Sequence, residues 1–255
     1  MAEPGLFPGE VAIVTGAASN IGRAIATALA REGADVILAD INADGMAATA
    51  AAIAALGGRC EQVAVDLAQR DGWQRLVAAL GPRIPHILVH SAAPARREAD
   101  HALAVSEATF DAMLDTNVRS GFFLARAVAE RMIAGRVRGR IAFITSLHAG
   151  TPRNLPHYSA AKAGQTMIVK ELARALGPHG IRVNAIAPGA IPGGGFNAAA
   201  FNFDGKIPLG RLGTADDIAA TTIAILSDRY AAYVTGTTIE VDGGLALFNW
   251  ITPVG

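Results

Sequence analysis

The most informative segment of the chain is Val11-Ala-Ile-Val-Thr-Gly16-Ala-Ala-Ser-Asn-Ile21-Gly22-Arg23. Its apolar start lacks polar alternation, which predicts a strand covered on both faces. A glycine-bearing turn and a helix start follow. Glycine leaves the backbone open to a ligand, and a helix N-terminus attracts anions, so the unit can accept a dinucleotide pyrophosphate. Two glycines also occur in ordinary strand–helix turns, and the rest of the chain must decide.

The remaining chain alternates short apolar runs with longer helical patterns. Strands are predicted at 36–39, 62–65, 87–90, 141–145, 183–186 and 238–241, and helices at about 21–31, 43–56, 69–80, 107–133, 159–176 and 215–226. This alternation predicts a Rossmann-like, doubly wound parallel sheet of about seven strands with helices on both faces. No composition shift marks a boundary, so we expect residues 1–255 to form a single dinucleotide-binding catalytic domain. The aperiodic segment 190–212 is expected to be a substrate lid.

Composition excludes several classes of protein. The chain is 51% hydrophobic, with 22 basic and 22 acidic side chains and zero formal net charge, which argues against disorder and against nucleic-acid binding. Charged or turn residues interrupt every apolar run, so no membrane span is expected. The single cysteine, Cys60, and the scattered histidines predict neither a disulfide framework nor a metal site. No signal-peptide pattern is visible, and we expect a cytoplasmic protein.

The second predicted strand ends at Asp40, where a carboxylate can accept hydrogen bonds from the hydroxyls of an adenosine ribose. The same charge would repel a 2′-phosphate. Neither Ser19 nor Ile41, the neighbours expected beside that position, is basic. The pattern therefore favours NAD(H) over NADP(H). The alternative is that Asp40 only ends the strand or caps the following helix.

Tyr158 and Lys162 stand four residues apart and project from one helix face. A cation beside a phenol stabilises the phenolate, so such a pair can act as a general acid and base. Alone, it is more often plain helix surface. Ser146 follows the fifth predicted strand, at the carboxyl edge where parallel sheets bind ligands, and strengthens the catalytic interpretation.

The order and spacing of these motifs resemble those of the short-chain dehydrogenase/reductase family, from about Gly9 to Leu247. The resemblance implies that Tyr158 exchanges a proton with the substrate oxygen and that Ser146 hydrogen-bonds this oxygen. Lys162 would support Tyr158 and hold the nicotinamide ribose, and Asn117 would position a water that links Lys162 to solvent. The implied cofactor-binding residues are Gly16, Ser19, Asn20, Ile21, Gly22, Asp40, Ile41, Asp66, Leu67, Ser91, Ala92, Tyr158, Lys162, Pro188, Gly189 and Ile191.

Three departures from the family pattern stand out. Asn20 replaces a glycine of the nucleotide turn, and asparagine tolerates unusual backbone angles better than most residues. The family's Asn-Asn-Ala-Gly reads His90-Ser91-Ala92-Ala93 here. Ser146 lies one residue closer to Tyr158 than is usual in the family. Thr145 would restore that spacing, but Ser146 fits the strand end better.

His148, His157 and Arg97 are candidates for substrate binding, each weighed against a plain surface or loop role. We expect an NAD-dependent oxidoreductase that acts on a small-molecule secondary alcohol or ketone. The first alternative is an NADPH-linked 3-oxoacyl-carrier-protein reductase. The second is a non-catalytic nucleotide-binding scaffold. The resemblance also implies a homotetramer.

Overall fold

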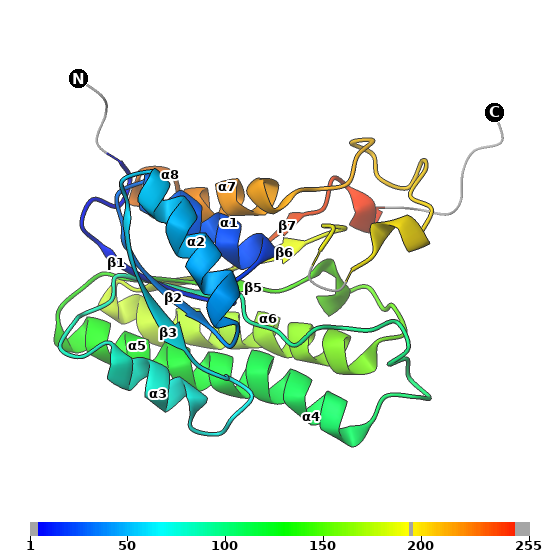
Figure 1. Ribbon diagram of the computed structural model, residues 1–255, viewed down its shortest axis with the longest axis horizontal. Helices are drawn as coiled ribbons and strands as arrows, with labels where there is room; N and C mark the ends of the chain where they lie inside the picture. The colour runs from blue at the N-terminus through cyan, green and yellow to red at the C-terminus, as the bar shows by residue number, and fades with distance from the viewer. Residues whose placement is uncertain (1–4, 194–195, 248–255) are drawn as a thin grey trace.

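The protein is described from a computed structural model that covers residues 5–193 and 196–247 (Figure 1). Within these residues the strands form one seven-stranded, wholly parallel sheet in the order β3-β2-β1-β4-β5-β6-β7. The strands are β1 (Val11–Thr15), β2 (Asp35–Asp40), β3 (Arg59–Ala64), β4 (Ile87–His90), β5 (Arg140–Ile144), β6 (Arg182–Pro188) and β7 (Thr238–Val241). The predicted fold class is confirmed, and the strand order reverses direction between β1 and β4, where such sheets bind ligands.

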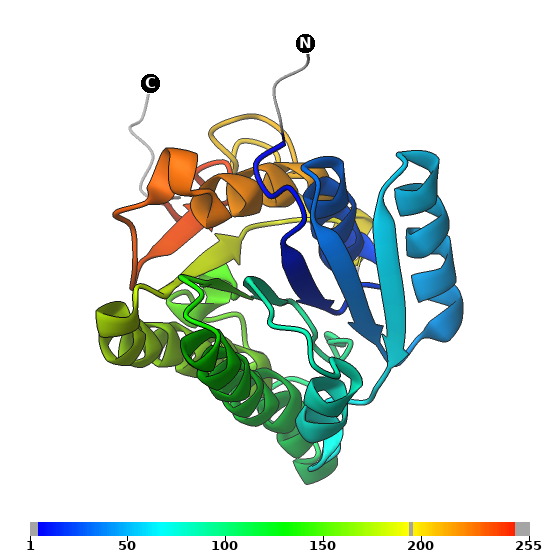
Figure 2. The ribbon, with the colours of Figure 1, turned by 90° about the vertical axis from the view of Figure 1, so that its left-hand side faces the viewer.

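Two helical layers cover the sheet (Figure 2). One layer holds α1 (Asn20–Arg31), α2 (Ala43–Ala55), α7 (Ala215–Leu226) and the short α8 (Asp228–Ala231); the other holds α3 (Gly72–Ala79), α4 (Glu107–Leu114), α5 (Gly121–Ala134) and α6 (Pro156–Leu176). Successive strand residues point to opposite faces, so Val14 packs into the first layer with Ile25, and Ile13 into the second with Val128. Burial on both faces explains why these strands lack polar alternation.

The helix expected over 107–133 is interrupted. A π-helical turn, Asp115–Ser120, separates α4 from α5. Such a turn displaces the backbone from the regular ladder and often marks a functional site. It contains Asn117, which the side chain of Gln165 contacts from α6. No periodicity in the sequence signals this break, because the helical side-chain pattern continues through it.

The expected lid, 190–212, lacks regular structure apart from a 3₁₀ turn at Ala198–Ala200, and its residues 194–195 lie outside the described part. Three phenylalanine rings hold it together: Phe196 lies 5.7 Å from Phe201 and 6.1 Å from Phe203, between ring centroids. Its role as a lid stays a prediction.

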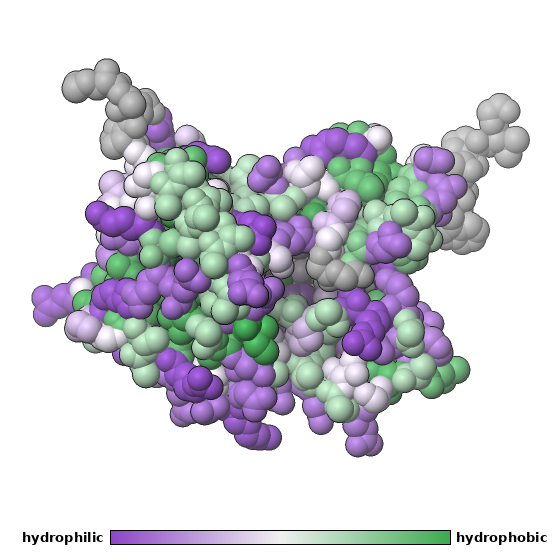
Figure 3. Space-filling view, in the orientation of Figure 1, coloured by the Kyte–Doolittle hydropathy of each residue, from purple (hydrophilic) through white to green (hydrophobic). Residues whose placement is uncertain are grey.

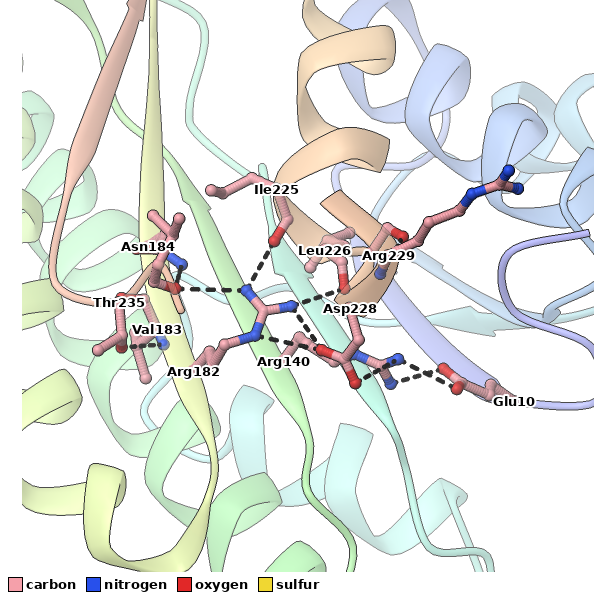
Figure 4. A network of polar contacts seen from close by, with 12 residues as sticks. Glu10, Arg140, Arg182, Val183, Asn184, Ile225, Leu226, Asp228, Arg229 and Thr235 are labelled. Atoms are coloured by element: carbon pink, nitrogen blue, oxygen red, sulfur yellow. Dashed lines mark hydrogen bonds and ion pairs between the residues drawn. The ribbon is translucent and has the colours of Figure 1, made fainter. Parts of the chain in front are cut away.

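A buried ionic network fixes the amino-terminal edge of the sheet (Figure 4). Arg182 donates to the carbonyls of Ile225 and Leu226 at the end of α7, at 2.8 and 2.9 Å, and to the carboxylate of Asp228. Arg140 binds Glu10 at 2.8 Å and also approaches Asp228. A cation at a helix C-terminus satisfies carbonyls that lack helical partners. This network lies opposite the carboxyl edge and leaves that edge free for a ligand.

The face shown in Figure 3 mixes hydrophilic and hydrophobic residues. Among the described helices, none combines the length and the hydropathy that crossing a bilayer requires.

Candidate active site

A main cleft of about 310 Å³ opens at the carboxyl ends of the strands, and a side slot of about 260 Å³ lies beside it. The main cleft is lined by the expected residues Gly16, Ser19, Asn20, Ile21, Gly22, Asp40, Ser91, Ser146, Tyr158, Lys162, Pro188, Gly189 and Ile191. The side slot is lined by Gly16, Asp40, Ile41, Asp66, Leu67 and Ala92. Every residue expected to bind the cofactor therefore lines one of two adjoining cavities.

The turn after β1 packs closely against the loop that follows β4. Gly16 has a φ of 70°, and a Cβ there would lie 2.9 Å from the nitrogen of Ala92. Asn20 has a φ of 46°, as expected of the residue that replaces a family glycine. Ser19 precedes α1 without a side-chain hydrogen bond to its first turn, so the first N–H groups keep their capacity to bind an anion. This turn fits a pyrophosphate.

Asp40 is held rigidly between the two cavities. Its carboxylate accepts hydrogen bonds from the backbone N–H of Ala18 at 3.0 Å and of Asn42 at 2.9 Å. The cap of α2 is Asn42, so Asp40 is not the cap of this helix. The nearby guanidinium of Arg23 already donates to the carbonyls of Ala18 and Gly45. Arg23 lines neither cavity, whereas the carboxylate of Asp40 lines both.

Two hydroxyl groups follow β5, and they have different partners. The hydroxyl of Thr145 donates to the carbonyl of Ile186 in β6 at 3.0 Å, so its proton is already used within the sheet. Within the described part of the chain, the Ser146 hydroxyl only accepts, from the N–H of His148 at 3.2 Å, so its own proton is available to a ligand in the main cleft. This difference supports Ser146 over Thr145, as the strand-end alignment suggested.

Lys162 lies buried beneath Tyr158. Its ammonium donates to the carbonyl of Ile144 at 2.8 Å and to Oε1 of Gln165 at 3.1 Å, and lies 5.7 Å from the ring centre of Tyr158. Burial, with a smaller contribution from the charge of Arg96, lowers the pKa of Lys162 to about 7. An ammonium has three protons, so one remains to meet a ligand or Tyr158.

Asn117 is fully buried in the π-helical turn. Its side-chain nitrogen donates to the carbonyl of Met113 at 2.9 Å, whereas its Oδ1 has no partner among the described residues. Its backbone carbonyl accepts from Nε2 of Gln165 at 2.9 Å. Gln165 thus bridges Asn117 and Lys162, the pair that the resemblance joins through a water. That water stays a prediction.

His90, where the family has asparagine, joins three elements. Its Nε2 lies 3.2 Å from the carbonyl of Thr116, and its Nδ1 lies 3.0 Å from the hydroxyl of Thr15. A carbonyl can only accept, so Nε2 carries the proton and Nδ1 accepts from Thr15. Complete burial lowers the pKa of His90 to about 3 and keeps the ring neutral. The ring therefore connects β1, β4 and the π-helical turn.

The substrate-binding candidates are placed differently from one another. His148 lines a third cavity of about 370 Å³ beneath the expected lid segment, which we call the lid cavity. His157 is buried, neither ring nitrogen has a partner among the described residues, and it lines none of the three cavities. Arg97 is exposed and also lines none of them, whereas its neighbour Arg96 lines both the main cleft and the lid cavity. The contact of Arg97 with substrate stays a prediction that this geometry does not favour.

Comparisons with known proteins agree with this geometry. A family model described as enoyl-(acyl carrier protein) reductase matches residues 16–246. The NAD(P)-dependent L-rhamnose 1-dehydrogenase of Azotobacter vinelandii is 34% identical, covering 91% of this chain and 95% of that protein. A short-chain type dehydrogenase/reductase from Mycobacterium marinum superposes with a TM-score of 0.86 at 30% identity, covering 94% of this chain and 96% of that one. A proposed 2-deoxy-D-gluconate 3-dehydrogenase from Agrobacterium tumefaciens, with bound NADP, gives 0.85 at 33% identity, covering 97% and 100%.

The chain is a member of the short-chain dehydrogenase/reductase family. It is therefore an oxidoreductase with a nucleotide-binding Rossmann fold and a nicotinamide cofactor.

Two residues that line or support the site of this short-chain dehydrogenase/reductase were not among those predicted from the sequence. Gln165 follows Lys162 by three positions and so shares its helix face, a spacing that could have drawn attention to it. Arg96 adjoins the candidate Arg97, and such an arginine pair can bind a carboxylate or phosphate or simply lie on the surface. The guanidinium carbon of Arg96 lies 5.0 Å from the ring centre of Tyr158, although the two residues are distant in the sequence.

Proposed function

We propose that the protein transfers a hydride between NAD(H) and a secondary alcohol or ketone, with Ser146, Tyr158 and Lys162 as its catalytic residues. The observation that carries the proposal is the convergence of all three on the main cleft, with the Lys162 ammonium buried beneath Tyr158. The bound nicotinamide supplies the hydride chemistry, and the protein supplies orientation and proton transfer.

The residues divide the proton chemistry among them. Ser146 donates a hydrogen bond to the substrate oxygen and so stabilises charge that develops there. Tyr158 removes the hydroxyl proton during oxidation and returns it during reduction. Lys162 stabilises the phenolate of Tyr158 through its charge, and its remaining proton is available to a ribose hydroxyl. Gln165 holds the ammonium of Lys162 from the same helix and is itself held by the backbone carbonyl of Asn117 in the π-helical turn.

We also propose NAD(H) as the preferred cofactor. Asp40 places a fixed carboxylate where the side slot meets the main cleft, and a 2′-phosphate there would be repelled. The relatives do not decide the matter, because one is named for both cofactors and another holds NADP. Isothermal titration calorimetry with NADH and NADPH tests this proposal: tighter binding of NADH supports it, and tighter binding of NADPH refutes it. That second result would favour the NADPH-linked acyl-carrier reductase.

The substrate is proposed to be a polyhydroxylated small molecule, because the relatives' names include a rhamnose and a deoxygluconate dehydrogenase. Turnover is measured by NADH absorbance on sugars, polyols, hydroxy acids and aryl alcohols. Tyr158→Phe should abolish turnover on any active compound while NADH still binds. Full activity in that variant would refute the catalytic assignment. Binding of nucleotide without turnover on the whole panel would support a non-catalytic scaffold instead.

We further propose a cytoplasmic homotetramer assembled through α5 and α6, as the family resemblance implies. Met167, on α6, is a large apolar side chain that is 55% exposed in the isolated chain, and packing between subunits would remove it from water. Light scattering at micromolar concentration should give four times the mass of the chain. A monomer under these conditions would contradict the proposal.

A further inference from the structure

The lid cavity joins the main cleft at a single cationic side chain. It is bordered by the loops after β4, β5 and β6 and by the segment 196–206. Arg96 lines both spaces, so a molecule that reaches from the Tyr158 hydroxyl into the lid cavity passes its guanidinium. A volume of about 370 Å³ is large enough for a small organic substrate.

The guanidinium of Arg96 is held between two aromatic rings and has no ionic partner in the part of the chain that the structure describes. Its carbon lies 5.0 Å from the ring centre of Tyr158 and 5.2 Å from that of Phe196, so it is sandwiched between the proposed catalytic residue and the expected lid. Its Nε is buried and has no hydrogen-bond partner among the described residues. An unpaired buried donor is costly, and it is therefore a position at which a ligand gains by supplying an acceptor.

The charges around the lid cavity have one sign. Arg96, Arg153 and Lys206 line it, whereas no aspartate or glutamate does so among the described residues. Arg153 binds Glu98 at 2.8 Å, and its guanidinium carbon also lies 4.7 Å from the ring centre of Phe201. The two arginines thus alternate with aromatic rings of the lid segment, which limits their movement.

His148 adds a hydrogen-bond acceptor to the same cavity. Its Nδ1 lies 2.9 Å from the carbonyl of Thr151, and because a carbonyl can only accept, the proton is on Nδ1. Burial lowers the pKa of His148 and favours the neutral ring. Nε2 is then left as an acceptor, which suits a hydroxyl group.

We propose that the lid cavity binds the anionic group of the substrate, so that the enzyme acts on hydroxylated acids or their keto forms rather than on neutral alcohols. The inference rests on the proposed function, since it names the substrate class of the same site. The planar guanidinium of Arg96 binds the carboxylate or phosphate through two parallel hydrogen bonds, and Lys206 adds positive charge, whereas the charge of Arg153 is balanced by Glu98. The secondary hydroxyl to be oxidised then lies at Ser146 and Tyr158, and a further hydroxyl donates to His148.

Matched substrate pairs test this directly. We would compare kcat/KM with NAD for pentonate and hexonate against the alditols with the same carbon skeletons, which differ only in the terminal carboxylate. The corresponding sugar phosphates form a second arm and distinguish a phosphate from a carboxylate. The wild-type enzyme should prefer the acid of at least one pair by about tenfold or more, and this preference should weaken as salt is added. Equal or better turnover of the alditols would overturn the inference.

Variants of the two adjacent arginines locate the effect. Arg96→Gln should raise the KM for the preferred anion about tenfold or more and reduce the ratio of anion to alditol turnover by as much. The ratio is the decisive readout, because any effect of Arg96 on Tyr158 influences both substrates and cancels. Arg96→Lys should retain part of the preference. Arg97→Gln alters the exposed neighbour, and a loss of preference there rather than in Arg96→Gln would move the site and refute the assignment.

The outcomes also separate this inference from the proposed function. If the enzyme oxidises alditols with NAD but ignores charge, the proposed function stands and the inference fails. If no compound is turned over although NADH binds, both fail. Should Arg96→Gln lose NADH binding through misfolding, the wild-type preference and its salt dependence still decide the question.

Discussion

The ammonium of Lys162 donates a 3.1 Å hydrogen bond to the side-chain oxygen of Gln165, whose amide nitrogen in turn donates to the carbonyl of Asn117. This amide connects the catalytic helix α6 directly to the π-helical turn. A glutamine can do so because its amide both accepts and donates. The orientation of Lys162 is thus linked to a second element of the fold by a side chain of its own helix.

Gln165→Leu should lower kcat about tenfold with little change in NADH affinity, because the buried ammonium of Lys162 loses a hydrogen-bond acceptor. Gln165→Glu should act in the opposite sense on the lysine, since an adjacent carboxylate raises the pKa of Lys162 and shifts the pH profile of kcat toward higher pH. Steady-state kinetics between pH 6 and 10 measure both effects. Lys170→Ala, which changes an exposed side chain of the same helix, serves as the control. A profile unmoved by Gln165→Glu would contradict the assigned contact.

Lys162→Met should be inactive yet more resistant to unfolding at neutral pH. Burial lowers the pKa of Lys162 to about 7, below its value near 10.5 in the unfolded chain. Between these values the unfolded state binds more protons, so the stability of the wild type should rise with pH across this window by a few kcal/mol. Thermal unfolding midpoints of both proteins at pH 7 and pH 9.5 measure the difference, which should shrink at the higher pH. If the difference between the two midpoints were the same at both pH values, it would contradict a strongly lowered pKa for Lys162.

Asp40→Asn should shift cofactor preference toward NADPH. The change removes the negative charge but keeps the size of the side chain and an oxygen for the N–H of Ala18. We expect the ratio of NADPH to NADH affinity to rise about tenfold or more, because the carboxylate no longer repels the 2′-phosphate of NADPH. Calorimetry with both cofactors provides the measurement. Asp66→Asn should affect both cofactors alike, because Asp66 lines only the side slot.

Arg182→Leu should destabilise the protein by about 1–3 kcal/mol, because the carbonyls of Ile225 and Leu226 at the end of α7 lose their buried donor, whereas the half-exposed Asp228 keeps its contact with Arg140. Chemical denaturation measures the loss. Arg174→Leu removes an exposed arginine of α6 and should change stability by about 0.5 kcal/mol or less. Cofactor affinity of the folded Arg182→Leu variant should stay normal, since the network lies at the opposite edge of the sheet. A matching loss of affinity would show that the two edges are coupled.

Local sequence patterns predicted most of the architecture. The bounds of β1 and β4 agree with the predicted ones, because a parallel strand covered on both faces is an uninterrupted apolar run. The interrupted helix over 107–133 could not be foreseen, since the π-helical turn depends on contacts of His90 and Gln165 with its carbonyls rather than on periodicity. Of the two arginines after β4, only the fold could show that Arg96 turns inward.

By itself, the sequence determined the parallel sheet, the glycine turn, the acidic end of β2 and the Tyr158–Lys162 pair. Each of these is a short-range pattern, in which spacing along the chain sets the distance in space. Two contacts around that pair depend on the tertiary structure: Gln165 with Asn117, and Arg96 with Tyr158 and Phe196. They join residues that are distant along the chain, and their positions depend on how the helical layers and the segment 196–206 pack over the edge of the sheet.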